Sequence, residues 1–133
     1  MAAKLLCDEP MSASSLVPAP ARSPRVVEQF HPAVRTWFER RFPDGPTDAQ
    51  LGGWPAILSG RHTLICAPTG SGKTLAGFLA AIHALYYANE AGEEIEGVTR
   101  VVYLSPLKAL AVDIRANLEE PLAEIADVAR ELG

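Results

Sequence analysis

One glycine-rich segment constrains the fold of this chain more than any other feature. Residues 67–74 read Ala-Pro-Thr-Gly-Ser-Gly-Lys-Thr, which fits the phosphate-binding pattern Gly-x4-Gly-Lys-Ser/Thr except for alanine at its first position. A short apolar run at 62–66 precedes it, and apolar residues at helical spacing follow over 75–86. The pattern predicts a buried strand, a tight loop and a long helix, with phosphate bound at the helix N-terminus.

The residues of this loop suit a nucleoside triphosphate with magnesium. Glycine allows the backbone N–H groups to approach phosphate closely. Lys73 would reach the β- and γ-phosphates of ATP, and the Thr74 hydroxyl would ligate magnesium, so these two are the predicted catalytic residues. The predicted nucleotide-binding residues of the loop are Thr69, Gly70, Ser71, Gly72, Lys73 and Thr74.

Two amphipathic helices are expected before the loop. The first begins at His31-Pro32, and the second has Thr47 as its N-cap and ends near residues 59–60. Gln50 lies in the first turn of the second helix. Its amide could both donate to and accept from an edge of adenine. The alternative is a capped helix start with an exposed glutamine.

The segment after the long helix repeats the strand-to-helix pattern. Residues 98–104 form the second predicted strand, and two apolar stripes, 107–118 and 122–132, predict helices after it. Strand, helix, strand, helix in this order predicts an α/β fold with a parallel sheet. Two strands leave that sheet incomplete, because sheets average about five or six strands.

The turn at Ser105, Pro106 and Lys108 joins the second strand to the next helix. Ligands of parallel sheets bind where strands end and helices begin. Free backbone N–H groups and Lys108 could hold a phosphate of DNA or RNA. The alternative is a proline at a helix start followed by a solvated lysine.

The rest of the sequence indicates a terminal tail, the charge of the protein and its cellular location. Residues 1–29 mix alanine, serine and proline without a helical or strand period, which predicts a disordered tail. The formal charge of -4 gives no basic patch. Two cysteines, Cys7 and Cys66, form no disulfide framework and are expected to be reduced. No apolar run approaches the roughly 20 residues of a membrane span, so we expect a cytoplasmic protein.

From about Phe30 onward, the chain resembles the superfamily 2 DEAD/DEAH-box helicases, and among them the large-helicase-related (Lhr) family. The shared motifs are Pro-Thr-Asp-Ala-Gln at 46–50, the loop at 67–74, and Tyr-Leu-Ser-Pro-Leu-Lys-Ala-Leu-Ala at 103–111. The resemblance implies a RecA-like P-loop NTPase domain. It also implies that Gln50 reads adenine, that 70–74 bind ATP, that 105–108 touch the nucleic-acid backbone, and that Phe42 stacks beside the base.

The family also uses an Asp-Glu-x-His/Asp motif and a second RecA-like domain. The sequence has one Asp-Glu pair, Asp8-Glu9, ahead of the loop, and Asp113 lies in a helical stripe that Ile114 continues. We therefore expect 30–133 to be the N-terminal part of RecA-like domain 1, with the missing helicase domains in cis. Alone, it should bind nucleotide without turnover. A stand-alone nucleotide-binding module and an unrelated P-loop kinase or transporter ATPase are the alternatives.

Overall fold

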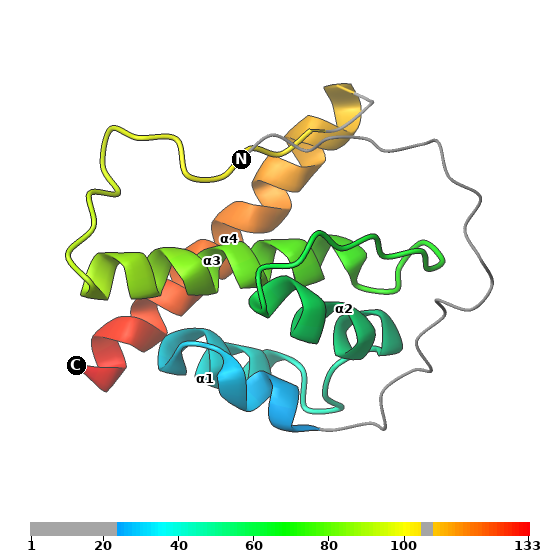
Figure 1. The fold of residues 1–133 in the computed structure, drawn as a ribbon, viewed down its shortest axis with the longest axis horizontal. Coiled ribbons are helices and arrows are strands. Elements are labelled where there is room, and N and C mark those ends of the chain that lie inside the picture. The colour runs from blue at the N-terminus through cyan, green and yellow to red at the C-terminus, as the bar shows by residue number, and fades with distance from the viewer. Residues whose placement is uncertain (1–23, 105–107) are drawn as a thin grey trace.

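The described part of the chain is built from helices. The computed structural model describes residues 24–104 and 108–133, with the backbone alone for 108–117. One 3-10 helix and four α-helices follow one another along the chain (Figure 1): η2 (Pro24–Gln29), α1 (Pro32–Arg41), α2 (Asp48–Leu58), α3 (Lys73–Glu90) and α4 (Lys108–Leu132).

The two predicted helices before the loop and the long helix directly after it are confirmed. Helix α1 begins with Pro32 at its first position, where a missing N–H costs nothing, and His31 caps it. Helix α2 opens with a capping box formed by Thr47 and Gln50. It is followed by Gly60, whose φ of 75° is a left-handed conformation suited to glycine.

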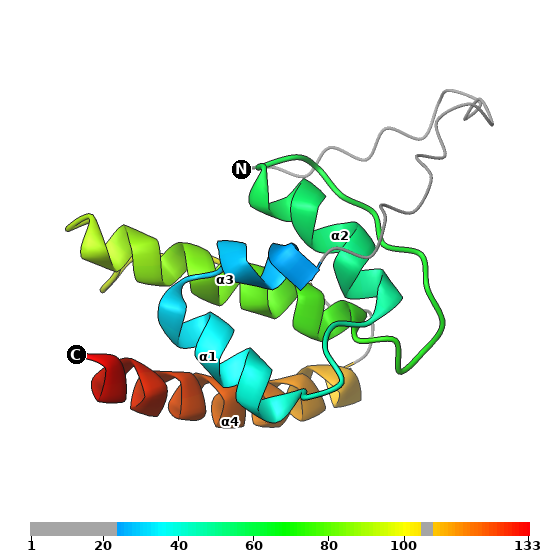
Figure 2. The ribbon, with the colours of Figure 1, turned by 90° about the horizontal axis from the view of Figure 1, so that it is seen from below.

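The helices pack in two pairs around a shared apolar core. Helix α1 contacts α4, α2 contacts α3, and α1 lies between α4 and the α2–α3 pair (Figure 2). The fully buried side chains with the largest volumes come from four helices, and they are Trp54, Leu79, Ile125 and Val34. This core fixes the start of α3, and so the phosphate loop, against α2.

The predicted tail is shorter than expected. Residues 24–29 lie within the predicted tail, yet they form η2 and bury Val26 and Val27 in the core. Four prolines lie between positions 10 and 24, so the spacing of apolar residues in this region does not indicate a helix. The rest of the predicted tail, residues 1–23, lies outside the described residues.

The two predicted strands are not formed in the described residues. Both 62–66 and 98–104 are irregular, and the side chains of Leu64 and Leu104 are 84% and 87% exposed. A strand needs a neighbour to pair its N–H and C=O groups, and neither segment has one here. The parallel sheet is therefore not confirmed, and Cys66, expected within a buried strand, is a free and exposed cysteine.

Helix α4 replaces the two helices that the sequence predicts at 107–118 and 122–132. It runs for 25 residues with Pro121 inside it. Proline removes one backbone hydrogen bond, but its fixed φ is compatible with a helix. The helix continues because Ile125 and Val128, beyond the proline, are buried in the core. Among the described residues, neither α4 nor any other helix is long and apolar enough to cross a membrane.

Candidate functional site

The glycine-rich loop leads directly into α3, as the sequence predicts. Residues 67–68 are irregular, 69–70 form a turn and 71–72 a bend, and α3 begins at Lys73. Gly70 and Gly72 both have φ of 80°, the left-handed region that favours glycine. The two glycines thus turn the chain sharply before the helix starts.

The N-terminus of α3 differs from those of α1 and α2. The side chains of His31 and Thr47 accept backbone N–H bonds at the starts of α1 and α2, whereas Gly72 begins α3 with no side-chain cap. The first N–H groups of a helix have no partner within it and carry partial positive charge. The start of α3 is therefore suited to an anion.

Lys73 is folded back onto the loop. Its Nζ donates to the carbonyl oxygens of Ala67 at 2.5 Å and Pro68 at 2.6 Å, and lies 3.5 Å from Ser71 Oγ. The ammonium group is thereby held at the mouth of the loop beside the uncapped helix start. An anionic ligand there would exchange neutral carbonyl partners for a charged one, which makes a stronger hydrogen bond.

Helix α2 brings Gln50 to the loop. The Gln50 side chain is buried, its Oε1 accepts from the Thr47 N–H at 2.9 Å, and its Nε2 donates to the Gly72 carbonyl at 3.5 Å. The structure therefore shows the capped helix start of the alternative, but the glutamine is not exposed. An amide has two N–H donors and two lone pairs, and these contacts use one of each.

Thr47 makes a second contact between α2 and the loop. Its Oγ donates to the Ser71 carbonyl at 2.7 Å. Together with Gln50, it fixes two successive carbonyl groups of the loop, those of residues 71 and 72. The sequence marks Thr47 as a helix cap alone, because its neighbour across the fold is visible only in the folded chain.

The remaining loop residues are open to solvent. Thr69 and Gly70 are exposed, and so is Thr74 in the first turn of α3. In the described ranges, no group of three or more His, Cys, Asp or Glu side chains could hold a metal ion. The donors here fit magnesium that arrives with a nucleotide, since magnesium commonly combines few protein oxygens with phosphate oxygens.

Two other predicted contacts, those of Phe42 and of residues 105–108, are not brought to the loop by the described residues. Phe42 packs against Trp37 and Phe38, with ring centroids 5.9 and 4.9 Å apart, so its ring belongs to the α1 cluster. Ser105 and Pro106 lie outside the described residues. Lys108 is the first residue of α4, and its side chain is not among those described.

A histidine cluster that sequence reasoning missed joins the start of α1 to α3. The backbone N–H of His31 donates to His83 Nδ1 at 2.9 Å, and His31 Nε2 lies 2.8 Å from Glu90 Oε1. Burial, and secondarily the charge of His31, lower the pKa of His83. The available signal was the seven-residue spacing of His83 and Glu90, which places both on one face of a helix.

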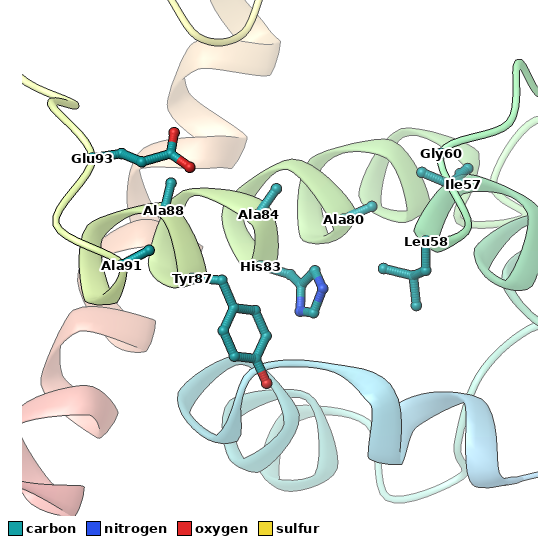
Figure 3. A pocket seen from close by; sticks show the side chains of 10 residues that line it. All are labelled: Ile57, Leu58, Gly60, Ala80, His83, Ala84, Tyr87, Ala88, Ala91 and Glu93. Carbon is teal, nitrogen blue, oxygen red and sulfur yellow. The ribbon is translucent and has the colours of Figure 1, made fainter.

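A hollow of ≈ 560 Å³ lies beside this cluster, away from the phosphate loop. The end of α2 and one side of α3 line it, and Figure 3 shows Ala80, Ala84 and Ala88 along α3, with His83 and Tyr87 directed toward η2 and α1. None of the predicted site residues lines this hollow. The phosphate loop therefore remains the candidate site.

Comparison with known proteins bears on the same region. Residues 47–133 match the DEAD/DEAH box helicase family. The chain is 51% identical over 105 residues to the Lhr helicase/probable uracil glycosylase of Mycolicibacterium smegmatis. These aligned residues cover 79% of the chain and 7% of that protein. It is 42% identical over 119 residues to the Lhr helicase/uracil glycosylase of Escherichia coli, and these residues cover 86% of the chain and 8% of that protein.

An archaeal relative is similar over the same part of the chain. The ATP-dependent helicase Lhr-Core of Methanothermobacter thermautotrophicus is 48% identical over 100 residues, covering 75% of the chain and 11% of that protein. No solved structure matches the chain. The chain thus spans between 7% and 11% of the lengths of these three relatives.

Proposed function

Because the chain belongs to the DEAD/DEAH box helicase family, we propose that it is the ATP-binding N-terminal part of an ATP-dependent DNA or RNA helicase. One observation carries the proposal: a glycine-rich loop that ends at the uncapped start of α3, with Lys73 at its mouth and Gln50 bonded to its last carbonyl. The whole protein would couple ATP hydrolysis to movement along nucleic acid.

Each residue of the loop has a role in this proposal. Backbone N–H groups of 70–72 and the start of α3 bind phosphate oxygens, with Thr69 at the edge of the loop. Lys73 leaves its carbonyl partners and pairs with the β- and γ-phosphates as a point charge. Magnesium, when bound with ATP, neutralises charge that develops on the phosphates, and the Thr74 hydroxyl would be its protein ligand.

Gln50 would read the base. The amide hydrogen and lone pair that its protein contacts leave unused are the pair that an adenine edge requires. Since the same amide holds the Gly72 carbonyl, base recognition and loop position would depend on one side chain. This makes adenine the preferred base of the proposed site.

We extend the proposal to the fold and the domains. Residues 30–133 would be the first part of a RecA-like domain that follows a tail within 1–29. Its sheet would use 62–66 and 98–104 as strands, and the remaining helicase domains would lie in cis. The exposed apolar side chains of 98–104, with Val102 at 73% and Leu104 at 87% exposure, support this, because an unpaired apolar segment gains from a neighbouring strand.

The experiment that tests ATP binding compares two lysine variants. We expect Lys73→Ala to weaken binding of the ATP analogue AMP-PNP with magnesium by roughly 10- to 100-fold, because a charge-assisted hydrogen bond contributes about 1.5–3 kcal/mol. Isothermal titration calorimetry measures the affinity, and thermal unfolding checks that the fold is retained. Unchanged affinity in the Lys73 variant would contradict the proposed site.

Lys108→Ala is the matched control and tests the proposed contact of Ser105, Pro106 and Lys108 with nucleic acid. It should leave AMP-PNP affinity unchanged while weakening single-stranded oligonucleotide binding. One lost phosphate contact lowers the dependence of log K on log salt by about 0.7 for single strands. Fluorescence anisotropy with DNA and RNA oligomers over a salt series measures this slope, and an unaltered slope would count against the contact.

A further inference from the structure

Trp54 links α2 to the first turn of α3, directly behind the phosphate loop. Its side chain is 0% exposed, and its indole Nε1–H donates to the Ala76 carbonyl at 3.1 Å. Ala76 follows Lys73 by three residues, so this carbonyl belongs to the turn that carries the lysine. The contact joins the interior of one helix to the start of the next.

Trp54 shares its face of α2 with the two residues that hold the loop. Thr47, Gln50 and Trp54 are spaced by three and four residues, which places them along one side of a helix. Their partners are three backbone carbonyls, those of residues 71, 72 and 76. One side of α2 thus fixes the chain immediately before and after Lys73.

The Trp54 ring is itself held in place. It makes edge contacts with Phe30 and Phe38, with ring centroids 4.9 and 5.3 Å apart. A buried donor that loses its partner destabilises the fold, because it has given up water without gaining another acceptor. Any shift of the first turn of α3 relative to α2 would therefore leave the indole N–H unpaired inside a buried aromatic cluster.

We infer that Trp54 is a positioning residue for the phosphate loop: its indole N–H locks the first turn of α3 so that Lys73 and the N-terminal amides of α3 stay arranged for a triphosphate. The inference rests on the proposed ATP-binding function. It assigns to Trp54 a role in affinity for nucleotide that is separate from its share in core packing.

The test replaces each of the two tryptophans of the chain by phenylalanine. Trp37 is the matched control, since it is also buried and its indole N–H also donates, to Glu124 Oε2 at 2.6 Å, but between α1 and α4. We expect Trp54→Phe to raise the Kd for AMP-PNP with magnesium about fivefold, the effect of losing one hydrogen bond of about 1 kcal/mol. Trp37→Phe should change the Kd less than about twofold at a similar loss of thermal stability.

The outcomes separate the inference from the proposed function. If the unaltered chain does not bind AMP-PNP, the proposed function fails and the inference with it. If the chain binds but both variants raise the Kd equally, or neither does, Trp54 acts through packing alone and the inference is overturned. A larger Kd in the Trp54 variant alone supports it.

A spectroscopic measurement keeps the inference testable even if Trp54→Phe does not fold. In the Trp37→Phe variant, Trp54 is the remaining tryptophan, so emission reports on the junction of α2 and α3. We expect the emission maximum to stay unchanged when saturating AMP-PNP with magnesium binds, because the indole N–H keeps its partner in the first turn of α3. A shift of the emission maximum while calorimetry detects binding would show that this turn moves relative to α2, and it would overturn the inference.

Discussion

Gly72 and Gly70 share a backbone conformation but not an environment. Both have φ of 80°. A Cβ added at Gly72 would lie 2.7 Å from Gln50 Nε2 and 3.3 Å from Thr47 Oγ1, whereas a Cβ at Gly70 would meet nothing within 4 Å. Gly70 is therefore needed for its dihedral angles, and Gly72 both for these and for the close approach of α2.

This difference predicts unequal costs for two alanine substitutions. Gly70→Ala should lower the free energy of unfolding by about 1–2 kcal/mol, the cost of a left-handed conformation in a residue with a Cβ. Gly72→Ala should lower it by about 1 kcal/mol more, because the methyl group displaces the Gln50 amide from the Gly72 carbonyl. Urea unfolding measures both. Equal losses would mean that Gln50 does not rest against Gly72.

The sequence predicts the individual residues of the loop better than their contacts. The spacing of glycine, lysine and threonine predicts the turn and the helix start, because both are properties of a short continuous segment. It does not predict that Lys73 bonds the Ala67 and Pro68 carbonyls or that Trp54 reaches Ala76. The Trp54 contact depends on how α2 packs against α3, which no local pattern encodes.

At the scale of elements, the junction of α1 and α3 depends on a neutral histidine. His83 Nδ1 accepts the His31 N–H, so this nitrogen must carry no proton. The side chains around it are Phe30 and Tyr87, while His31 itself faces Glu90. Protonation of His83 would replace the acceptor with a donor beside another histidine.

The lowered pKa of His83 gives this junction a definite pH dependence. As the pH falls, the unfolded chain binds a proton on this histidine near the ordinary pKa of about 6.5. The folded chain binds it only at a lower pH. The contribution of neutral His83 to the free energy of unfolding is therefore complete above that pH, and it is lost as the pH falls toward the lower pKa of the folded state. We expect the thermal midpoint to drop between pH 7.5 and pH 5.5.

His83→Asn should reduce that drop, because asparagine offers an oxygen acceptor that does not titrate. His62→Asn serves as the control, since His62 is exposed and its loss should leave the pH dependence as it is. Thermal unfolding followed by circular dichroism at both pH values measures the difference. The same drop in the His83 variant as in the unaltered chain would assign it to other groups.

Helices and strands differ in how well the sequence predicts them here. Val34, Trp37 and Phe38 of the first predicted helix and Leu79 and Ile82 of the long helix are buried, as the helical period predicts. A helix satisfies its hydrogen bonds within one segment, whereas a strand needs partners supplied by other segments. The apolar runs 62–66 and 98–104 carry the composition of strands without such partners.

At the scale of the whole molecule, the packing of α4 on α1 could not be predicted. It joins residues about 90 positions apart, through Trp37 with Glu124 and through Arg40 Nη1 with Glu131 Oε2 at 2.8 Å. The sequence predicts apolar stripes on both helices but contains no signal for which stripe meets which. The sequence therefore does not predict how the helices are arranged around the loop.

The uncapped start of α3 has a consequence for the lifetime of the folded chain. His31 and Thr47 cap the starts of α1 and α2, whereas the start of α3 has no side-chain cap, and in the proposed function a nucleotide phosphate would bind there. A ligand that binds only the folded state stabilises it by about 2.7 kcal/mol at one hundred times its Kd. If nucleotide binds as proposed, the folded chain would therefore open less often to proteases when nucleotide is present.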